Sequence, residues 1–127
     1  MVSYSVIVHV NEIERWPIAL NNIRNLLNDA GAANVRVELV ANGPAVLFYA
    51  DETAERIPSI PDIVLYRQGV QDMHTLYDKG IRFIACANAL KMTNIAQAQL
   101  LPFVDVVPAG ITEIVKKQAE GYAYVKP

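Results

Sequence analysis

The sequence predicts one α/β domain with a five-stranded, mostly parallel sheet and helices on both of its faces. Short β-branched runs alternate along the chain with longer helical patterns, and this order is typical of a parallel sheet built from βαβ units. A length of 127 residues fits a single domain over residues 1–127. Hydrophobic residues make up 53% of the chain and charged residues only 19%, so the material for a buried core is ample.

The first half of the chain begins with a strand over residues 3–10, which has a β-branched apolar run at its centre. A helix follows, with Pro17 near its first turn and Gly31 at its end. Its apolar face is formed by Trp16, Leu20, Ile23, Leu27 and Ala30. Strict alternation over residues 35–40 predicts a second strand that is half exposed, at an edge of the sheet.

The middle of the chain is less regular. Pro44 suits the first position of a helix, so residues 45–50 are predicted to open one, although a strand fits the same six residues. Residues 52–67 contain two prolines and give no firm element. A helical face then follows over residues 70–77.

The second half supplies the remaining strands. They are predicted at residues 81–86, 104–107 and 122–125. Asn88 is expected to cap a helix after the first of them, and a further helix is expected over residues 110–120. Tyr122 and Tyr124 lie two apart, so they share one face of the last strand, and an aromatic core or a subunit contact is the favoured interpretation.

The composition argues against several classes of function. The 11 basic and 13 acidic residues are scattered and give a net charge of -2, which does not predict nucleic-acid binding. The N-terminus lacks the basic region of a signal peptide, and no apolar run reaches the ~18 residues of a membrane span, so no membrane partner is expected. The single cysteine excludes an intrachain disulfide and fits a reducing, cytoplasmic compartment.

Cofactor and metal signatures are also missing from the sequence. One cysteine and two separated histidines form no metal-binding pattern. No dinucleotide-binding fingerprint or P-loop pattern occurs, so nucleotide binding is weakly supported. We therefore expect neither a metal nor an organic cofactor.

Ligands of open parallel sheets bind at the carboxyl ends of the strands, and this rule selects the candidate site residues. They are His9 after the first strand, Asn42 and Gly43 after the second, Cys86 and Asn88 at the third, and Gly110 after the fourth. Gly43 and Gly110 each open a helix after a strand, where backbone N–H groups can cradle an anion.

Cys86 is the strongest candidate for chemistry. It directly precedes a predicted helix N-terminus, which favours the thiolate, the nucleophilic form of cysteine, so we expect it to be partly accessible. The alternative is that Cys86 is a small core hydrophobe, as free cysteines often are. His9 is a base or orienting partner for Cys86 if their strands lie close together, and otherwise a solvated or core histidine.

Three segments together suggest a family. The segment Gly80–Leu90 resembles the cysteine-bearing strand-to-helix turn of the DsrE/DsrF-like proteins. Residues 106–110, with the tail from Gln118 to Pro127, resemble their C-terminal signature, and residues 40–45 resemble their second strand and loop. The resemblance extends over nearly the whole chain and is closest to a short branch of the family.

The resemblance implies a three-layer α/β/α fold with a five-stranded parallel sheet, assembled as homo-oligomers, often trimers or hexamers. It also implies that the cysteine matched by Cys86 carries sulfur as a persulfide. The first functional hypothesis is therefore a sulfur carrier or sulfurtransferase that relays sulfur between donor and acceptor proteins. Asn88 would stabilise the anion and His9 would assist, without an organic cofactor.

The second hypothesis is a non-catalytic homo-oligomeric module in which Cys86 is structural. It would bind a small ligand or a protein segment through Asn42 and Asn88. The high apolar content predicts self-association under both hypotheses. Thiol reactivity is the property that discriminates between them.

Overall fold

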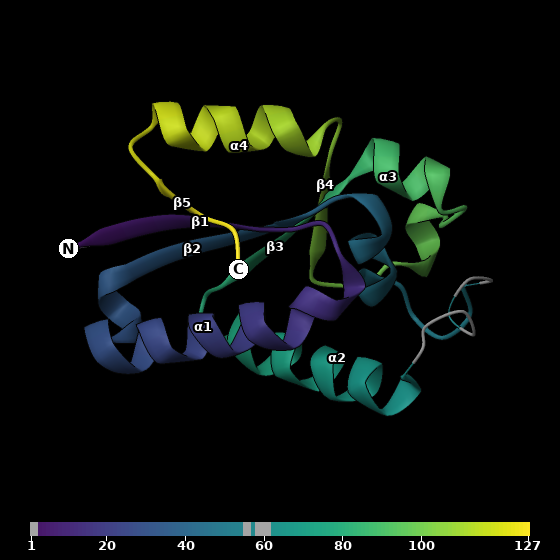
Figure 1. The fold of residues 1–127 in the computed structure, drawn as a ribbon, viewed down its shortest axis with the longest axis horizontal. Coiled ribbons are helices and arrows are strands. Elements are labelled where there is room, and N and C mark those ends of the chain that lie inside the picture. The colour runs from purple at the N-terminus through teal and green to yellow at the C-terminus, as the bar shows by residue number, and fades with distance from the viewer. Residues whose placement is uncertain (1–2, 55–56, 58–61) are drawn as a thin grey trace.

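The sheet has five strands in the order β4-β3-β2-β1-β5, and every neighbouring pair is parallel (Figure 1). The computed structural model describes residues 3–54, 57 and 62–127. The strands are β1 (Tyr4–Val10), β2 (Val35–Ala41), β3 (Arg82–Cys86), β4 (Val104–Val107) and β5 (Ala123–Val125). The predicted α/β fold with a five-stranded parallel sheet is confirmed.

Helices cover both faces of this sheet and complete the three layers. In Figure 1, α1 (Trp16–Ala30) and α2 (Ile63–Asp78) lie below the sheet, and α4 (Gly110–Ala119) lies above it. The short helix α3 (Ala87–Met92) follows β3 directly. Short 3-10 helices connect these elements, and those with described bounds are η1 (Ile13–Arg15), η2 (Ala32–Asn34), η3 (Gly43–Tyr49) and η5 (Gln97–Gln99).

The larger core lies between the sheet and the pair α1 and α2, and the segment η3 is packed into it. The Trp16 indole stacks on Phe48 with ring centroids 5.5 Å apart, and its Nε1–H donates to the Ala45 carbonyl at 2.9 Å. The Tyr49 hydroxyl donates to the Leu39 carbonyl of β2 at 2.9 Å. These buried contacts resolve the alternative left open for residues 45–50, because they hold this stretch as a 3-10 helix.

A smaller core lies on the opposite face, under α4. It consists of Ile7, Val40 and Ile84 from three adjacent strands and Ile114 from the helix, with Tyr122 packed beside them. Side chains alternate between the two faces of a strand. The residues two positions further along these strands, His9, Asn42 and Cys86, therefore follow this apolar cluster toward the carboxyl edge of the sheet.

The prediction that the second strand lies at a sheet edge is wrong. β2 pairs with β1 on one side and β3 on the other. Along this strand only Arg36 is exposed, and Glu38 is buried although it is charged. The alternation of polar and apolar residues suggested a solvated face, whereas α4 covers that face and supplies Lys117 as a partner for Glu38.

The other deviations occur at helix ends. Cys86, not Asn88, is the N-cap residue of α3, so the expected capping by Asn88 is wrong. α2 begins earlier than the apolar pattern predicted, because the Asp62 carboxylate caps it by accepting from the Leu65 N–H at 3.0 Å. Part of the stretch left unassigned, residues 55–56 and 58–61, lies outside the described residues. Among the described helices, none combines the length and the apolar character needed to cross a membrane.

Candidate functional site

The candidate site is at the carboxyl edge of the sheet, where β1, β2 and β3 end next to each other. Cys86 is both the last residue of β3 and the N-cap of α3. Its backbone is extended, and its side chain makes no capping hydrogen bond. The thiol is free, and the residue is only 6% exposed in the single chain. The expected partial accessibility is therefore small in this structure.

Gly110 brings the first turn of α4 close to Cys86 and Asn42. A Cβ placed on Gly110 would lie 3.3 Å from the Cys86 Cβ, 3.6 Å from the Asn42 Cβ and 3.2 Å from Cγ1 of Val40. All three side chains thus surround one point at which only a hydrogen atom is present. A Cβ at position 110 would require Val40 and Cys86 to give way by a few tenths of an ångström, so glycine lets the first turn of α4 approach them without that adjustment. The structure brings together three of the predicted site residues.

Gly43 has a different local role, in the turn that follows Asn42. Its φ of 53° is in the left-handed region, which disfavours other residues. A Cβ there would also lie 3.3 Å from the Asn11 carbonyl oxygen. Gly43 thus lets the chain turn from β2 into η3 directly after Asn42.

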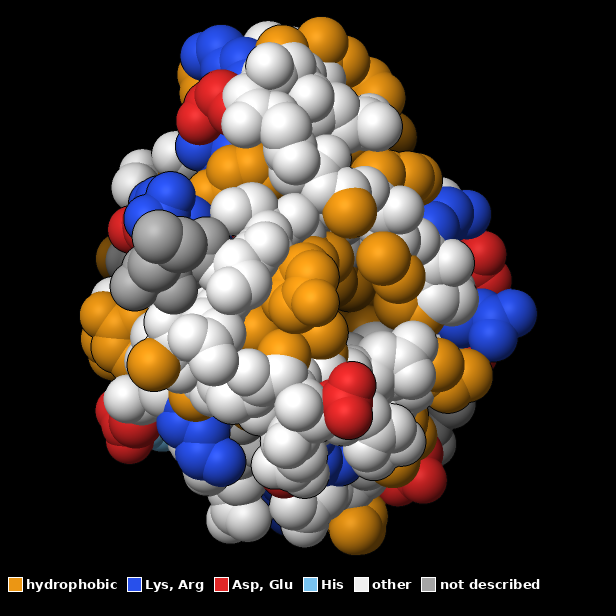
Figure 2. Space-filling model, turned by 90° about the vertical axis from the view of Figure 1, so that its left-hand side faces the viewer, with side chains coloured by type: hydrophobic (Ala, Val, Ile, Leu, Met, Phe, Trp, Pro, Cys, Tyr) orange, Lys and Arg blue, Asp and Glu red, His pale blue; other side chains and the backbone are white. Residues whose placement is uncertain are grey.

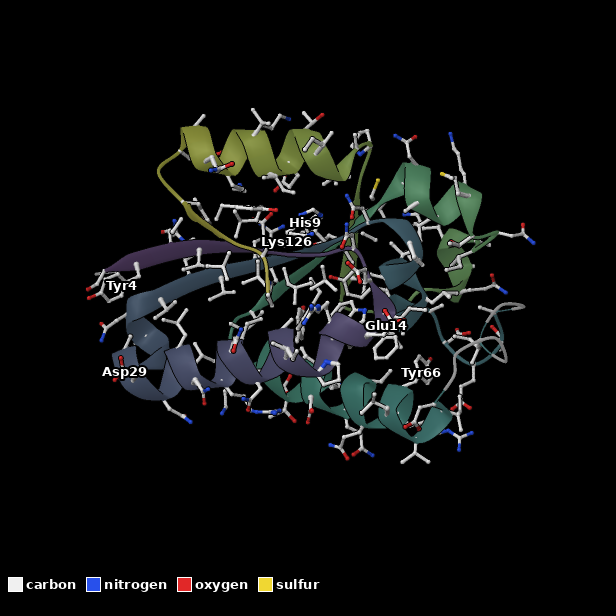
Figure 3. The ribbon with its side chains drawn as sticks, in the orientation of Figure 1. Tyr4, His9, Glu14, Asp29, Tyr66 and Lys126 are labelled. Carbon is white, nitrogen blue, oxygen red and sulfur yellow. The ribbon has the colours of Figure 1, made fainter. Side chains whose placement is uncertain are left out.

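His9 contacts Asn42 and Tyr124. Its Nε2 lies 3.0 Å from Oδ1 of Asn42, and its Nδ1 lies 2.7 Å from the Tyr124 hydroxyl. Figure 3 shows His9 at the sheet surface on the side of α4. The strand β2 separates β1 from β3, so Asn42 stands between His9 and Cys86. Among the described contacts, His9 makes no hydrogen bond to the thiol.

Asn88 is the predicted site residue that the structure leaves apart. It lies in the first turn of α3 and is exposed. None of the hydrogen bonds recorded for the described residues joins it to Cys86, Asn42 or His9. Asn42 is therefore the amide that lies beside the thiol.

Sequence reasoning missed the hydrogen-bonding role of Tyr124. This residue belongs to β5, which pairs with β1 so that Tyr124 is opposite Ile7. Its position two residues after Tyr122 identified a shared face, but the pairing of the first and last strands was not predictable from spacing. The contact between His9 and Tyr124 joins residues that are 115 positions apart in the sequence.

A second group of polar side chains lies further back on the same face of the sheet. Glu38 is 2% exposed, and its Oε2 lies 3.7 Å from the Lys117 ammonium and 3.8 Å from the Arg82 guanidinium. Its Oε1 is buried without a hydrogen-bond partner in the described structure. Burial, and then a hydrogen bond and charge repulsion from Glu113, raise the pKa of Glu38 from 4.5 to about 7, although Lys117 and Arg82 act in the opposite direction.

No metal site is evident in the described part of the chain. Nowhere among those residues do three or more histidine, cysteine, aspartate or glutamate side chains gather in a way that could hold an ion. Glu38 and Glu113 face two cationic side chains instead.

Comparison with known proteins identifies the family. The family model described as "DsrE/DsrF-like family" matches residues 6–127. The chain belongs to the DsrE/DsrF-like family. This family is linked to sulfur relay, and the resemblance noted in the segment around Cys86 is thereby confirmed.

Two solved structures share the fold of this DsrE/DsrF-like protein. The protein of unknown function MTH1491 from Methanobacterium thermoautotrophicum is 32% identical, with a TM-score of 0.78 over 98% of this chain and 99% of the other. The ychN protein from E. coli is 12% identical, with a TM-score of 0.70 and full coverage of both chains, which shows a common fold. Among curated proteins, none matches significantly.

Proposed function

We propose that this DsrE/DsrF-like protein is a sulfur carrier that holds sulfane sulfur as a persulfide on Cys86 and passes it to a partner. The observation that supports the proposal best is the position of its only thiol. Cys86 ends a strand inside a parallel sheet, beside Asn42 and the first turn of α4. Ligands of this fold class bind at that edge, and the family is linked to sulfur relay.

The proposed reaction consists of two thiol exchange steps. The Cys86 thiolate attacks the outer sulfur of a donor such as thiosulfate, and a bond forms between Sγ and that sulfur. The bond inside the donor breaks, and sulfite leaves with the electron pair. An acceptor thiolate then attacks the outer sulfur of the persulfide, and Cys86 leaves as a thiolate. No external oxidant or reductant is consumed.

Cys86 has a polar neighbour, the amide of Asn42, and apolar neighbours in α3. Asn42 offers an amide close to the sulfur, whereas Ala89 and Leu90 of α3 are buried in the same core as the thiol. A hydrogen-bond donor near a thiolate or persulfide stabilises its negative charge. An apolar wall limits contact with water and so protects the persulfide from side reactions.

The burial of Cys86 favours a second candidate function. A thiol that is only 6% exposed is also what a structural cysteine looks like. In that case the protein is a non-catalytic module, and the half-buried Asn42 and His9 would bind a small ligand or a segment of a partner protein. Sulfur loading separates the two candidates, because only the carrier takes up sulfur in its folded state.

The test is intact mass spectrometry of the folded protein after incubation with thiosulfate or polysulfide. We expect a gain of sulfur on the single thiol, and dithiothreitol should remove it. A sample unfolded in urea serves as the control for thiol reactivity. If sulfur is gained only after unfolding, the carrier proposal is wrong and the binding module is preferred.

Self-association is a further part of the proposal. The side of the molecule in Figure 2 shows an apolar hollow, and a cavity of about 320 Å³ is lined by side chains of β1, α1 and β5. Its lining is Val6, Val8, Asn22, Ile23, Asn25, Leu26 and Val125. Ile111 and Val115, one turn apart on α4, are also exposed, at 63% and 59%. Such surface is often covered by another subunit.

We therefore expect a homo-oligomer, and the family resemblance implies that three or six chains assemble. Light scattering coupled to size-exclusion chromatography should give a multiple of the 14.0 kDa chain mass at micromolar concentration. The apparent mass should fall on dilution only at much lower concentrations. A strict monomer throughout the micromolar range would contradict this prediction.

A further inference from the structure

We propose that Tyr124 is a positioning residue of the Cys86 site, which acts through His9 to orient the amide of Asn42. The inference rests on the proposed sulfur-carrier function. Its basis is a chain of contacts from β5 through β1 to the end of β2, namely Tyr124 to His9 at 2.7 Å and His9 to Asn42 at 3.0 Å.

Which atoms can donate and which can only accept determines where the protons lie along the contacts between Tyr124, His9 and Asn42. Oδ1 of Asn42 can only accept, so Nε2 of His9 must donate to it. In a neutral imidazole the other ring nitrogen, Nδ1, then carries a lone pair. The Tyr124 hydroxyl, 2.7 Å away, donates to that lone pair. Tyr124 thereby fixes His9 in the form that carries its proton on Nε2.

The orientation of the Asn42 amide follows from this assignment. Its oxygen points to His9 on β1, so its NH₂ group, on the other side of the planar amide, is directed away from β1. β3 and Cys86 lie on that side of β2. The hydrogen bonds recorded for the described residues give this NH₂ group no acceptor. Its two N–H groups are therefore available to a thiolate or persulfide at Cys86.

Without the Tyr124 hydroxyl, the proton of the His9 ring is no longer fixed on Nε2. Without its donor, Nδ1 of His9 no longer has a partner, and the proton can move from Nε2 to Nδ1. The unprotonated Nε2 then prefers the NH₂ group of Asn42 to its oxygen. The amide turns over, and its donors face His9 instead of the sulfur.

Tyr124→Phe tests this, with Tyr122→Phe as a matched control. Tyr122 precedes the same strand, and its ring lies beneath the Lys117 ammonium at 5.5 Å, with no recorded hydrogen bond to its hydroxyl in the described structure. We expect Tyr124→Phe to slow sulfur uptake by Cys86 from thiosulfate about 5- to 10-fold, the effect of one lost hydrogen bond. Tyr122→Phe should leave the rate unchanged. Equal rates in the two variants would overturn the inference.

Asn42→Ala shows whether Tyr124 acts through Asn42. In this background the rate should already be low, and adding Tyr124→Phe should lower it no further, because the two changes interrupt the same chain of contacts. Additive losses would mean that Tyr124 acts by another route and would refute the positioning role.

Nitrogen-15 NMR of the histidine rings tests this inference independently of the proposed function, because it reports which ring nitrogen carries the proton whether or not sulfur is taken up. The chain has two histidines, and the exposed His74 serves as an internal reference. His9 should show the Nε2–H form at neutral pH and a mixture of both forms in Tyr124→Phe. A wild-type His9 with its proton on Nδ1 contradicts the proposal. If the tautomer shift is seen but wild type takes up no sulfur, the carrier function fails and the hydrogen-bond chain stands.

Discussion

Replacing Cys86 by Ser is expected to abolish sulfur uptake completely and to leave the fold intact. The hydroxyl of serine is not ionised at neutral pH and does not attack sulfane sulfur as a thiolate does. The chain has no other cysteine, so any sulfur retained by the variant would have to reside outside a thiol. Intact mass spectrometry with and without dithiothreitol measures the loss directly.

Cys86→Ala provides the control for stability. Serine introduces a hydroxyl at a position that is only 6% exposed, and burying it without a partner costs about 1–3 kcal/mol. Alanine removes the thiol without that cost, although it leaves a small cavity. Both variants should unfold cooperatively and lack sulfur uptake. If either variant still gains sulfur that dithiothreitol removes, Cys86 is not the carrier.

Iodoacetamide measures the access that this reaction requires. Burial predicts that alkylation of wild-type Cys86 in the folded protein is slower than in the urea-unfolded protein, whereas a reactive site predicts faster alkylation than for a free thiol. The carrier proposal expects the second outcome, since small reagents must reach the sulfur. Inertness until unfolding would identify Cys86 as a core residue and direct attention to ligands of Asn42.

Glu38→Gln is expected to change the pH dependence of stability more than any other carboxyl substitution in the described chain. Because the folded-state pKa of Glu38 is raised to about 7 from 4.5, the folded protein holds this proton more tightly than the unfolded chain. The contribution of Glu38 to stability is therefore fully present below pH 4.5 and is lost as the pH rises through about 7.

The measurement is the free energy of unfolding by urea, compared between wild type and variant. The stability of Glu38→Gln relative to wild type should increase by about 3 kcal/mol at most between acidic and mildly alkaline pH. Taking the difference removes the contributions of carboxyl groups that both proteins share. Glu113→Gln should weaken the dependence of wild-type stability on pH, since the Glu113 carboxyl is the next largest cause of the raised pKa of Glu38 after burial.

Glu52→Gln is the matched control, because its stability relative to wild type should change with pH in the opposite direction. A hydrogen bond from Arg67 lowers the pKa of the exposed Glu52. The stability that Glu52 contributes is present above its unfolded-state pKa and is lost as the pH falls. Relative to wild type, Glu52→Gln should thus become less stable as the pH rises. If the free energy of unfolding of Glu38→Gln relative to wild type does not change with pH, Glu38 is ionised normally in the folded protein.

The fold was largely predictable from the sequence, because apolar runs and turn residues indicate where each strand and helix begins and ends. The strand over residues 104–107 was predicted exactly, and the helix from Gly110 ends one residue before its predicted end. β2 was misplaced, since alternation cannot distinguish a charge facing water from one facing a buried partner. Glu38 is the second kind, and its partner Lys117 is about eighty residues away in the sequence.

The candidate site was predictable only as a set of strand ends. The rule that ligands bind at the carboxyl edge selected Cys86, Asn42 and Gly110, and the structure places these residues around one point. The rule contains no strand order, so it could not show that Asn42 separates His9 from Cys86. It also could not show that the Tyr124 hydroxyl bonds to the His9 ring.

The pairing of β1 with β5 has a consequence for synthesis of the protein. β1 precedes β5 by more than a hundred residues in the sequence, and among the described strands β5, at Ala123–Val125, is the one that pairs with the outer edge of β1. Until those residues are translated, the nascent chain exposes unpaired backbone groups along β1, which is a hazard for aggregation. The three-residue β5 then closes that edge and brings Tyr124 to His9 in the same event. Completion of the site is thus coupled to protection of the sheet.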